Sequence, residues 1–204
     1  MNEFCNLTGR VAVITGPAKG MGAAATLMLA KAGADMVLVG RDLTPIEEVA
    51  SDVRGLGRRA EIVQCDVTSD SDVDAMRDAA LSALGTIDIL VNIAGGTGPL
   101  GKRSWETTGE EFDQIINLNM KGCFLTMRSV LPTMIEKRYG KIVNVGGTFG
   151  LRGRALRMAY SASKWGLRGI TKSTALEVGP HNINVNCVCP GMVDGPRFQT
   201  VCAE

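Results

Sequence analysis

The chain has 204 residues, of which 45% are hydrophobic and 21% charged, and its formal net charge is +1. This length suits one globular domain, and the near-neutral charge, with only isolated basic pairs, argues against nucleic acid as a partner. Because no apolar run approaches ~18 residues and the N-terminus has no charged-then-apolar leader, we expect no membrane partner and a cytoplasmic location.

Short β-branched runs alternate with longer segments of helical pattern. Several runs are nearly continuous in apolar residues, as in VAVIT and IDILVN, which indicates strands buried on both faces of a parallel sheet. Right-handed crossovers between such strands produce an α/β, doubly wound Rossmann fold with helices on both faces. With no repeat or linker, we expect a single domain over residues 1–204. The predicted strands are Val11–Thr15, Met36–Val39, Glu61–Gln64, Ile87–Asn92, Lys141–Val145 and Asn184–Val188.

Glycines and capping residues mark the helix ends. Gly33 is expected to close a helix from about Met21, and Gly85 one from about Ser71. Thr108 and Glu111 have the spacing of a capping box that opens a long helix. Pro132 is expected to kink or reset that helix.

The six cysteines show no metal-binding pattern, because they include no Cys-x-x-Cys pair. Cys187 and Cys189 are spaced to place two thiols on one strand face, but a metal site needs more ligands. We therefore expect reduced cysteines that pack as small apolar residues, and no metal.

A glycine-rich loop, Thr15-Gly16-Pro17-Ala18-Lys19-Gly20-Met21-Gly22, follows the first strand and opens a helix. Glycine at 16, 20 and 22 lets the turn close and lets the helix N-terminus approach an anion. Lys19 and Met21 belong to the same loop. The pattern predicts a binding site for the pyrophosphate of a dinucleotide.

The second strand ends in Val39-Gly40-Arg41-Asp42, where a dinucleotide fold recognises the adenosine ribose. An acidic residue at the strand end would repel a 2′-phosphate, but Gly40 stands there. Arg41 can grip a phosphate bidentately, and Lys19 adds a second cation, so we expect NADP(H) to be preferred. In the alternative interpretation Arg41 is a solvated strand-end residue and Asp42 contacts the ribose, which would allow NAD(H).

A second group of polar residues, Tyr160-Ser161-Ala162-Ser163-Lys164, follows the fifth predicted strand. The i, i+4 spacing puts Tyr160 and Lys164 on one face of a helix. A free tyrosine is a poor acid–base group at neutral pH, but a nearby ammonium lowers the pKa of the phenol toward that range. The pair therefore predicts general acid–base chemistry.

With these motifs the chain resembles the short-chain dehydrogenases/reductases over nearly its whole length. The resemblance implies an oxidoreductase that transfers a hydride between NADP(H) and a carbonyl or secondary alcohol. The residues that carry it, in the family's order, are the glycine loop, Asp66-Val67, Asn92-Ile93-Ala94-Gly95, Asn119, Tyr160 with Lys164, and Pro190-Gly191.

The resemblance also implies a role for each matched residue. Tyr160 would exchange a proton with the substrate oxygen, Lys164 would hold the nicotinamide ribose, and Asn119 would fix a water of a proton relay. Asn92 has an alternative role, which is only to tie strands together. The expected cofactor contacts are Asp66 and Val67 at the adenine, Asn92, Ala94 and Gly95 along the adenosine ribose and cofactor backbone, and Pro190, Gly191 and Val193 at the nicotinamide.

Three positions depart from the family pattern. The serine usually found thirteen residues before the tyrosine is Gly147 here, and we expect neighbouring Thr148 to supply its hydroxyl. Ile93 replaces the second asparagine of Asn-Asn-Ala-Gly, and Gly195 replaces a threonine that binds the carboxamide. Relatives also continue into a helical substrate lid and a last strand, which this chain is expected to lack.

Two functions from different classes fit these observations. Retention of Tyr160, Lys164 and Asn119 favours an enzyme. Gly147 and the expected lack of a lid favour the alternative, a catalytically weak NADP(H)-binding regulatory or scaffold protein.

The expected partners are a small carbonyl or alcohol substrate and further copies of the chain. The resemblance implies a dimer or tetramer built through the long helices near 107–137 and 160–179. Arg152, Arg154 and Arg157 precede Tyr160, and Lys102-Arg103 lies in the loop after the fourth strand. These cations lead us to expect a negatively charged substrate; in the alternative interpretation most of their side chains are simply exposed on the surface.

Overall fold

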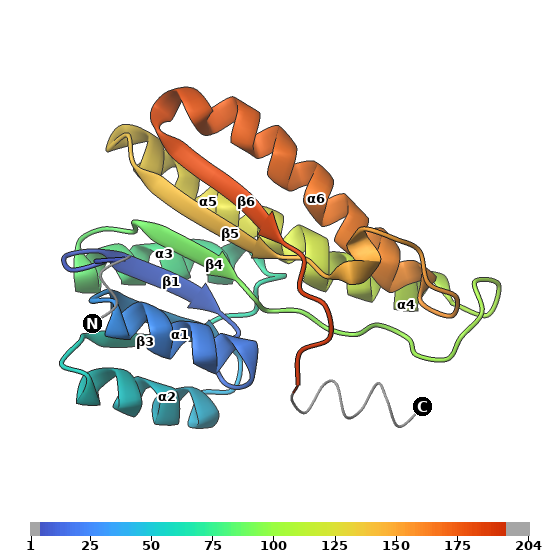
Figure 1. Ribbon diagram of the computed structural model, residues 1–204, viewed down its shortest axis with the longest axis horizontal. Helices are drawn as coiled ribbons and strands as arrows, with labels where there is room; N and C mark the ends of the chain where they lie inside the picture. The colour runs from blue at the N-terminus through green and yellow to red at the C-terminus, as the bar shows by residue number, and fades with distance from the viewer. Residues whose placement is uncertain (1–4, 195–204) are drawn as a thin grey trace.

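The computed structural model describes residues 5–194 as a single sheet with helices on both faces (Figure 1). All strand pairs are parallel, and their order is β3-β2-β1-β4-β5-β6. The order reverses between β1 and β4, which is the point where doubly wound sheets bind ligands beyond the carboxyl ends of their strands. The predicted Rossmann fold is confirmed.

Each predicted strand is present, with small shifts at the ends. The longest shift is in β4, which begins at Ile89 rather than Ile87. Such terminal differences of one or two residues are ordinary for strands that fray into loops. The strands are β1 (Val11–Thr15), β2 (Asp35–Gly40), β3 (Ala60–Gln64), β4 (Ile89–Asn92), β5 (Gly140–Val145) and β6 (Ile183–Val188).

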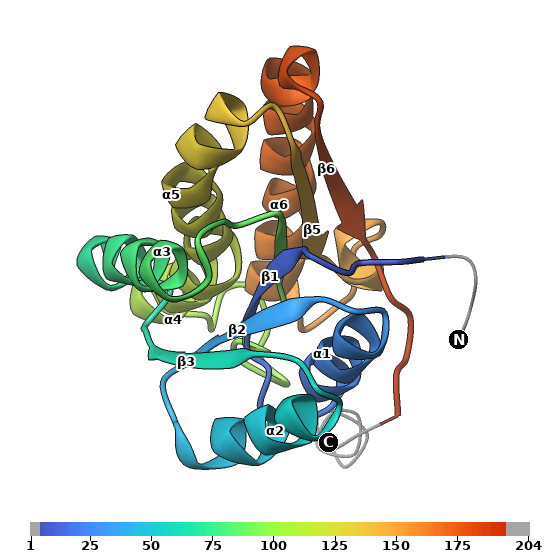
Figure 2. The same ribbon diagram turned by 90° about the vertical axis from the view of Figure 1, so that its left-hand side faces the viewer.

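The helices divide between the two faces of the sheet (Figure 2). Helices α1 and α2 cover one face, where Ile14 and Leu38 of the strands pack with Ile46 and Val53 of α2. Helices α3, α5 and α6 cover the other. The six are α1 (Met21–Lys31), α2 (Thr44–Gly55), α3 (Asp70–Leu84), α4 (Gly109–Ile116), α5 (Gly122–Glu136) and α6 (Met158–Val178).

Most of the predicted helix ends are confirmed. Gly33 follows the end of α1 with φ 107°, and Gly85 ends α3 with φ 79°, both in the left-handed region that glycine tolerates. At the start of α4, both hydrogen bonds of the Thr108–Glu111 capping box are formed.

The expected reset at Pro132 is wrong, because α5 continues past it to Glu136. Buried side chains such as Leu125 and Val130 hold α5 on the sheet, and this packing offsets the ~3 kcal/mol that an internal proline costs. The irregular segment lies instead at Asn117–Lys121, which is π-helical and joins α4 to α5. Such bulges are frequent at functional sites.

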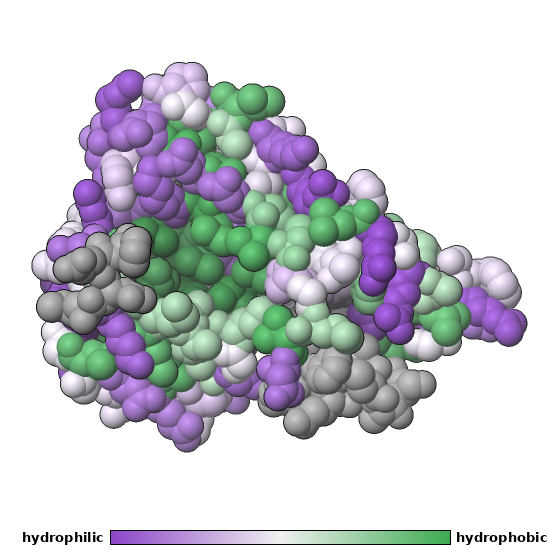
Figure 3. Space-filling model, in the orientation of Figure 1, coloured by the Kyte–Doolittle hydropathy of each residue, from purple (hydrophilic) through white to green (hydrophobic). Residues whose placement is uncertain are grey.

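Strands β1, β2 and β4 are buried on both faces, as predicted. Strands β5 and β6, at one end of the sheet, are not. There burial alternates along the strand, and Val188 is 52% exposed. The reason is that no helix in the described range 5–194 follows β6 to cover this face. Figure 3 shows apolar residues gathered in a hollow on that side.

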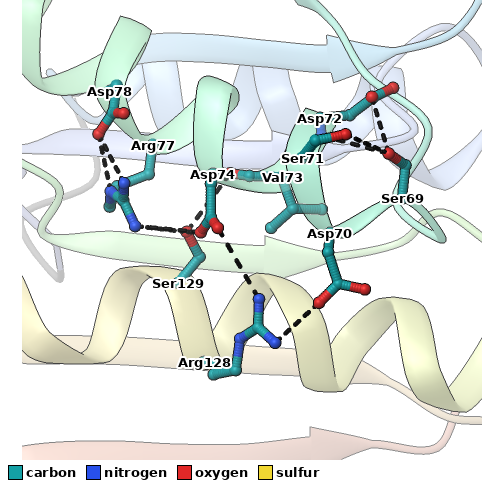
Figure 4. A network of polar contacts seen from close by, with 10 residues as sticks. All are labelled: Ser69, Asp70, Ser71, Asp72, Val73, Asp74, Arg77, Asp78, Arg128 and Ser129. Atoms are coloured by element: carbon teal, nitrogen blue, oxygen red, sulfur yellow. Dashed lines mark hydrogen bonds and ion pairs between the residues drawn. The ribbon is translucent and has the colours of Figure 1, made fainter.

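A network of ion pairs fixes α3 against α5 (Figure 4). Arg128 of α5 contacts Asp70 at 2.8 Å and Asp74 at 3.9 Å, and Arg77 of α3 contacts Asp74 at 3.1 Å. The Ser129 hydroxyl lies 3.0 Å from the same Asp74 carboxylate. These contacts hold the helix that leads out of the π-helical segment.

Residues 5–194 contain neither a membrane-spanning helix nor a cluster of metal ligands. No described helix is long and apolar enough to cross a membrane. No cluster of three or more histidine, cysteine or acidic side chains in that range could hold a metal ion. Cys187 and Cys189 do lie on one face, with their Sγ atoms 3.9 Å apart.

Candidate active site

The glycine loop packs so tightly that side chains are excluded at its centre. A Cβ on Gly22 would lie 1.9 Å from the Gly16 carbonyl oxygen, and one on Gly16 would lie 3.0 Å from the Ala94 backbone. Gly16 and Gly20 also have positive φ angles of 72° and 55°. Gly20 is the N-cap of α1 and makes no side-chain cap, so no capping side chain occupies this end of the helix, where the helix dipole favours an anion.

Thr15 joins this loop to the segment after β4. Its Oγ1 accepts hydrogen bonds from the backbone N–H groups of Ile93 (3.1 Å) and Ala94 (3.2 Å). The side chain is 1% exposed. Sequence reasoning gave Thr15 no role, although a polar side chain at the end of an otherwise apolar strand was an available signal.

Arg41 and Asp66, the residues expected at the adenosine end, lie together at the carboxyl ends of β2 and β3. Arg41 Nη1 lies 3.8 Å from Asp66 Oδ2, and the Arg41 side chain is 74% exposed. Hydrogen bonds from the Thr68 N–H and hydroxyl, with the Arg41 charge nearby, hold the pKa of the Asp66 carboxyl below its usual value. Lys19 is exposed in the glycine loop. The arrangement leaves both cations accessible to an anion.

Asp42 and Val67 also border this end. The Asp42 carboxylate accepts a hydrogen bond from the Thr44 N–H at the start of α2, which occupies one of its oxygens. Val67 is buried against Gly122 of α5, where a Cβ would lie 2.9 Å from Val67 Cγ2. The Val67 side chain therefore packs in the core, and only its backbone is available to a ligand.

Asn92 is turned into the sheet rather than toward the loops. Its Nδ2 donates to Asn144 Oδ1 (2.9 Å), and its Oδ1 accepts from the Thr126 hydroxyl (2.8 Å). Asn144 in turn donates to Thr171 of α6 (2.9 Å). Because the Asn92 side chain is 2% exposed, its contacts are those of the alternative interpretation, a residue that ties strands together.

Tyr160 and Lys164 lie one turn apart near the start of α6, as their spacing predicts. Lys164 is 5% exposed; its Nζ lies 5.9 Å from the centre of the Tyr160 ring and donates to the Val145 carbonyl at 2.8 Å. Phe149 meets the same ring edge-on, with ring centres 6.2 Å apart. The phenol therefore stands beside an ammonium at the carboxyl end of β5.

Asn119 lies in the π-helical segment and is fully buried. Its amide brackets Gly96, accepting from the backbone N–H at 2.8 Å and donating to the carbonyl at 3.2 Å. It also donates to the Ser163 hydroxyl (3.1 Å), which donates to the Tyr160 carbonyl (2.7 Å). Ser163, which sequence reasoning passed over, thus links Asn119 to the helix that carries Tyr160.

The departure at Gly147 lies beside the phenol. A Cβ built on Gly147 would lie 3.3 Å from Tyr160 Oη. The expected substitute, Thr148, donates its hydroxyl to the Pro190 carbonyl at 3.0 Å, so this hydrogen is not directed at a substrate. In this conformation the Thr148 hydroxyl links the end of β5 to the segment after β6. Sequence could not show this, because Pro190 is 42 residues away.

The segment after β6 lies at the edge of the site. Gly191 and Val193 are exposed, and Pro190 is anchored by Thr148. Gly195 lies outside the described residues.

The five cations expected to attract a negative substrate have separate surroundings. Arg152 and Arg154 are exposed, while Lys102 forms an ion pair with Glu111. Arg103 lies over the Trp105 ring, 5.5 Å from its centre. Arg157 is buried beside Tyr160. Only Arg152 and Arg154 combine exposure with nearness in sequence to Tyr160.

Known proteins resemble the chain in sequence and in structure. Residues 10–203 match the family model described as short chain dehydrogenase. The 3-oxoacyl-(acyl-carrier-protein) reductase of Thermotoga maritima is 36% identical over 194 residues, covering 95% of this chain and 78% of the relative. A ketoacyl reductase of granaticin polyketide synthesis from Streptomyces violaceoruber is 37% identical over 193 residues, covering 94% and 70%.

Solved structures give the same result. NAD+-bound xylitol dehydrogenase aligns with a TM-score of 0.92 at 31% identity, covering 95% of this chain and 75% of that one. Actinorhodin polyketide ketoreductase with NADPH aligns with a TM-score of 0.90 at 33% identity, covering 95% and 74%. The nicotinamide cofactors of these two structures agree with the glycine loop found here. The chain is therefore a member of the short-chain dehydrogenase/reductase family and an NAD(P)-dependent oxidoreductase.

Proposed function

We propose that the protein transfers a hydride between NADP(H) and a carbonyl or secondary alcohol, with Tyr160 and Lys164 handling the proton. The observation that carries the proposal is the meeting of Tyr160, buried Lys164 and the Asn119–Ser163 contact at the carboxyl ends of the strands, next to the glycine loop. A purely regulatory or scaffold role would not need these groups together, so we favour the enzyme.

The residues fit a dinucleotide. A side chain at Gly22 would clash with the Gly16 carbonyl oxygen, so the turn closes tightly at the N-terminus of α1, as it does in dinucleotide-binding loops. We assign Gly16, Lys19, Gly20, Met21 and Gly22 to the pyrophosphate. The remaining assigned contacts are Arg41, Asp66, Val67, Asn92 (through its backbone), Ala94, Gly95, Lys164, Pro190, Gly191 and Val193. A bound nicotinamide dinucleotide supplies or accepts the hydride.

The chain's own residues control the proton. In reduction, the Tyr160 O–H donates its proton to the substrate oxygen as negative charge develops there, and in oxidation the phenolate takes that proton back. Lys164, held against the Val145 carbonyl, stabilises the phenolate, and it would also hold the nicotinamide ribose of a bound cofactor. To Asn119, anchored on Gly96, we assign the role of fixing a water in a proton relay to solvent.

Preference for NADP(H) rests on Arg41 and Lys19. Arg41 faces Asp66 at 3.8 Å but stays largely exposed, so a 2′-phosphate can replace or share this weak partner. Asp42, the residue that would favour NAD(H), is engaged by the Thr44 N–H.

The test measures the dissociation constants of NADPH and NADH for the native protein, Arg41→Ala and Arg128→Ala. Arg128 is an exposed, ion-paired arginine of α5 and serves as the control. Loss of a phosphate contact should weaken NADPH binding about tenfold or more in Arg41→Ala and leave NADH unchanged. Equal native affinities, or the same loss in both variants, would contradict the assignment.

For the substrate we propose a small carbonyl compound that carries a negative charge. Exposed Arg152 and Arg154 between β5 and α6 support this proposal. The test measures the substrate KM at several ionic strengths. The KM should rise with salt if the substrate is an anion and stay constant if it is neutral.

The remaining proposals concern organisation. We propose that residues 1–204 form one domain and that copies pair through α4, α5 and α6. Phe124 of α5 and Trp165 of α6, which are 45% and 49% exposed, support the pairing. Light scattering across a dilution series tests it.

A further inference from the structure

Arg157 has an unusual environment for an arginine. It is 7% exposed and immediately precedes α6 as its N-cap. A guanidinium stays charged in a protein, and burying that charge is costly unless other groups compensate. Burial of the Arg157 charge therefore requires compensating contacts.

The Arg157 guanidinium makes two contacts inside the protein. Arg157 Nη2 donates to the Thr97 carbonyl at 2.9 Å, in the loop that follows β4. Its Cζ lies 4.8 Å from the centre of the Tyr160 ring, within the range of a cation–π interaction. The guanidinium thus contacts both the proposed proton donor and a loop that borders the site.

The backbone before Arg157 is strained. Leu156 has φ 62°, in the left-handed region that a bulky side chain rarely adopts. Strain of this kind persists only where the surrounding structure imposes it, and it clusters at functional sites. Here the turn at Leu156, which is exposed, comes directly before the residue that is buried beside Tyr160.

We propose that Arg157 is a positioning residue for Tyr160: its guanidinium holds the ring from one side, ties it to the loop at Thr97, and favours the ionised phenol through its fixed charge. The inference rests on the proposed function, because it assumes that Tyr160 donates the proton. It supplies a second cation beside the phenol in addition to Lys164.

Other ionisable groups near Tyr160 and Lys164 come from the loop before α6 and from α4, α5 and β6. Arg154 lies over Phe149 at 5.2 Å, one ring away from Tyr160, and is exposed. Burial raises the pKa of the Cys123 thiol of α5 and of the Cys187 thiol of β6 to about 11, so these neighbours of Lys164 stay neutral at working pH. Helix α4, which packs on α6, also carries three acidic residues, of which Glu111 is paired with Lys102; the others are Glu110 and Asp113.

The sequence allows a direct titration of the phenol, because Tyr139 and Tyr160 are the only tyrosines. In a Tyr139→Phe background, the ultraviolet absorbance of phenolate reports Tyr160 alone, without cofactor or substrate. The experiment compares this background with added Arg157→Gln and Arg157→Lys. Gln removes the charge and keeps an N–H donor, whereas Lys keeps the charge.

The pH midpoint of the Tyr160 titration should rise by about one unit with Arg157→Gln and by less than half of that with Arg157→Lys. The basic limb of the pH profile of kcat/KM should move with it. A midpoint shifted by neither substitution, or equally by both, would overturn the proposal, since a packing role does not distinguish Gln from Lys. If both variants fail to fold, Lys164→Met in the Tyr139→Phe background decides, because it leaves Arg157 as the cation beside the phenol: a Tyr160 titration midpoint below about 9 supports the proposal and a higher one overturns it.

Failure of the proposed function would look different. If Tyr160→Phe keeps its turnover, Tyr160 is not the proton donor, whatever its titration. If Tyr160→Phe is inactive while Arg157→Gln leaves the midpoint unchanged, only the role of Arg157 is refuted.

Discussion

Restoring a hydroxyl at Gly147 tests whether the site lacks a hydrogen-bond donor for the substrate oxygen. The structure allows the substitution, because Gly147 has φ 163° and ψ 162°, an extended conformation that any residue adopts. A Cβ there would lie 3.3 Å from Tyr160 Oη. Gly147→Ser therefore adds an O–H beside the phenol, where the family usually has one.

The size of the effect follows from the chemistry. One donor aimed at a developing oxyanion contributes about 2.7–4 kcal/mol, or 10²–10³ in turnover. A contact of 3.3 Å is tighter than most Cβ contacts, so the phenol must move by a few tenths of an ångström. We therefore expect turnover to rise by about 10²-fold, the lower end of that range.

The assay follows nicotinamide absorbance on a carbonyl substrate turned over by the native protein, with Gly147→Ala as the matched control. Alanine adds the same Cβ without the hydroxyl and should not raise turnover. Thr148→Ala should lower turnover less than tenfold, because its hydroxyl is committed to Pro190. If Gly147→Ser is no faster than Gly147→Ala in folded protein, or if Thr148→Ala costs 10² or more, the reasoning fails.

Two further predictions concern stability and the cofactor. Burial alone would raise the pKa of Asp35, but hydrogen bonds from Arg59 and Arg58 hold it below its usual value, so its stabilisation is present above about pH 4 and lost as pH falls through the folded pKa. In urea unfolding, Asp35→Asn should cost about 2 kcal/mol at pH 7 and clearly less at pH 3; an equal cost at both would refute this. Gly22→Ala, whose Cβ would meet the Gly16 oxygen at 1.9 Å, should weaken cofactor binding at least tenfold, whereas Gly55→Ala, with open space around it, should not.

Sequence was enough for the fold because its signals are local. Buried strands such as Val11–Thr15 read as continuous apolar runs, and the glycine loop and the Tyr160/Lys164 spacing depend on positions close in the chain. Right-handed crossovers then give the doubly wound arrangement, whereas the strand order β3-β2-β1-β4-β5-β6 comes from the structure.

The rest depended on contacts that spacing does not encode. The Thr148 hydroxyl is directed at a carbonyl from another strand end, and Asn92 at an asparagine 52 residues away. Pro132 did not reset its helix because tertiary packing outweighed a local rule. Arg157 was expected to face an anionic substrate, and its burial against Tyr160 appears only when two loops are brought together.

The central claim, that Tyr160 donates the proton, is tested most directly by Tyr160→Phe beside Tyr139→Phe. Both substitutions remove one phenol hydroxyl and keep the ring, and Tyr139 lies against Arg10 and Lys141. Turnover and the cofactor dissociation constant are measured for each. We predict that Tyr160→Phe lowers turnover by about 10²–10⁴ with cofactor affinity within about threefold of native, while Tyr139→Phe keeps both. A Tyr160→Phe protein that retains more than about a tenth of native turnover would contradict the account.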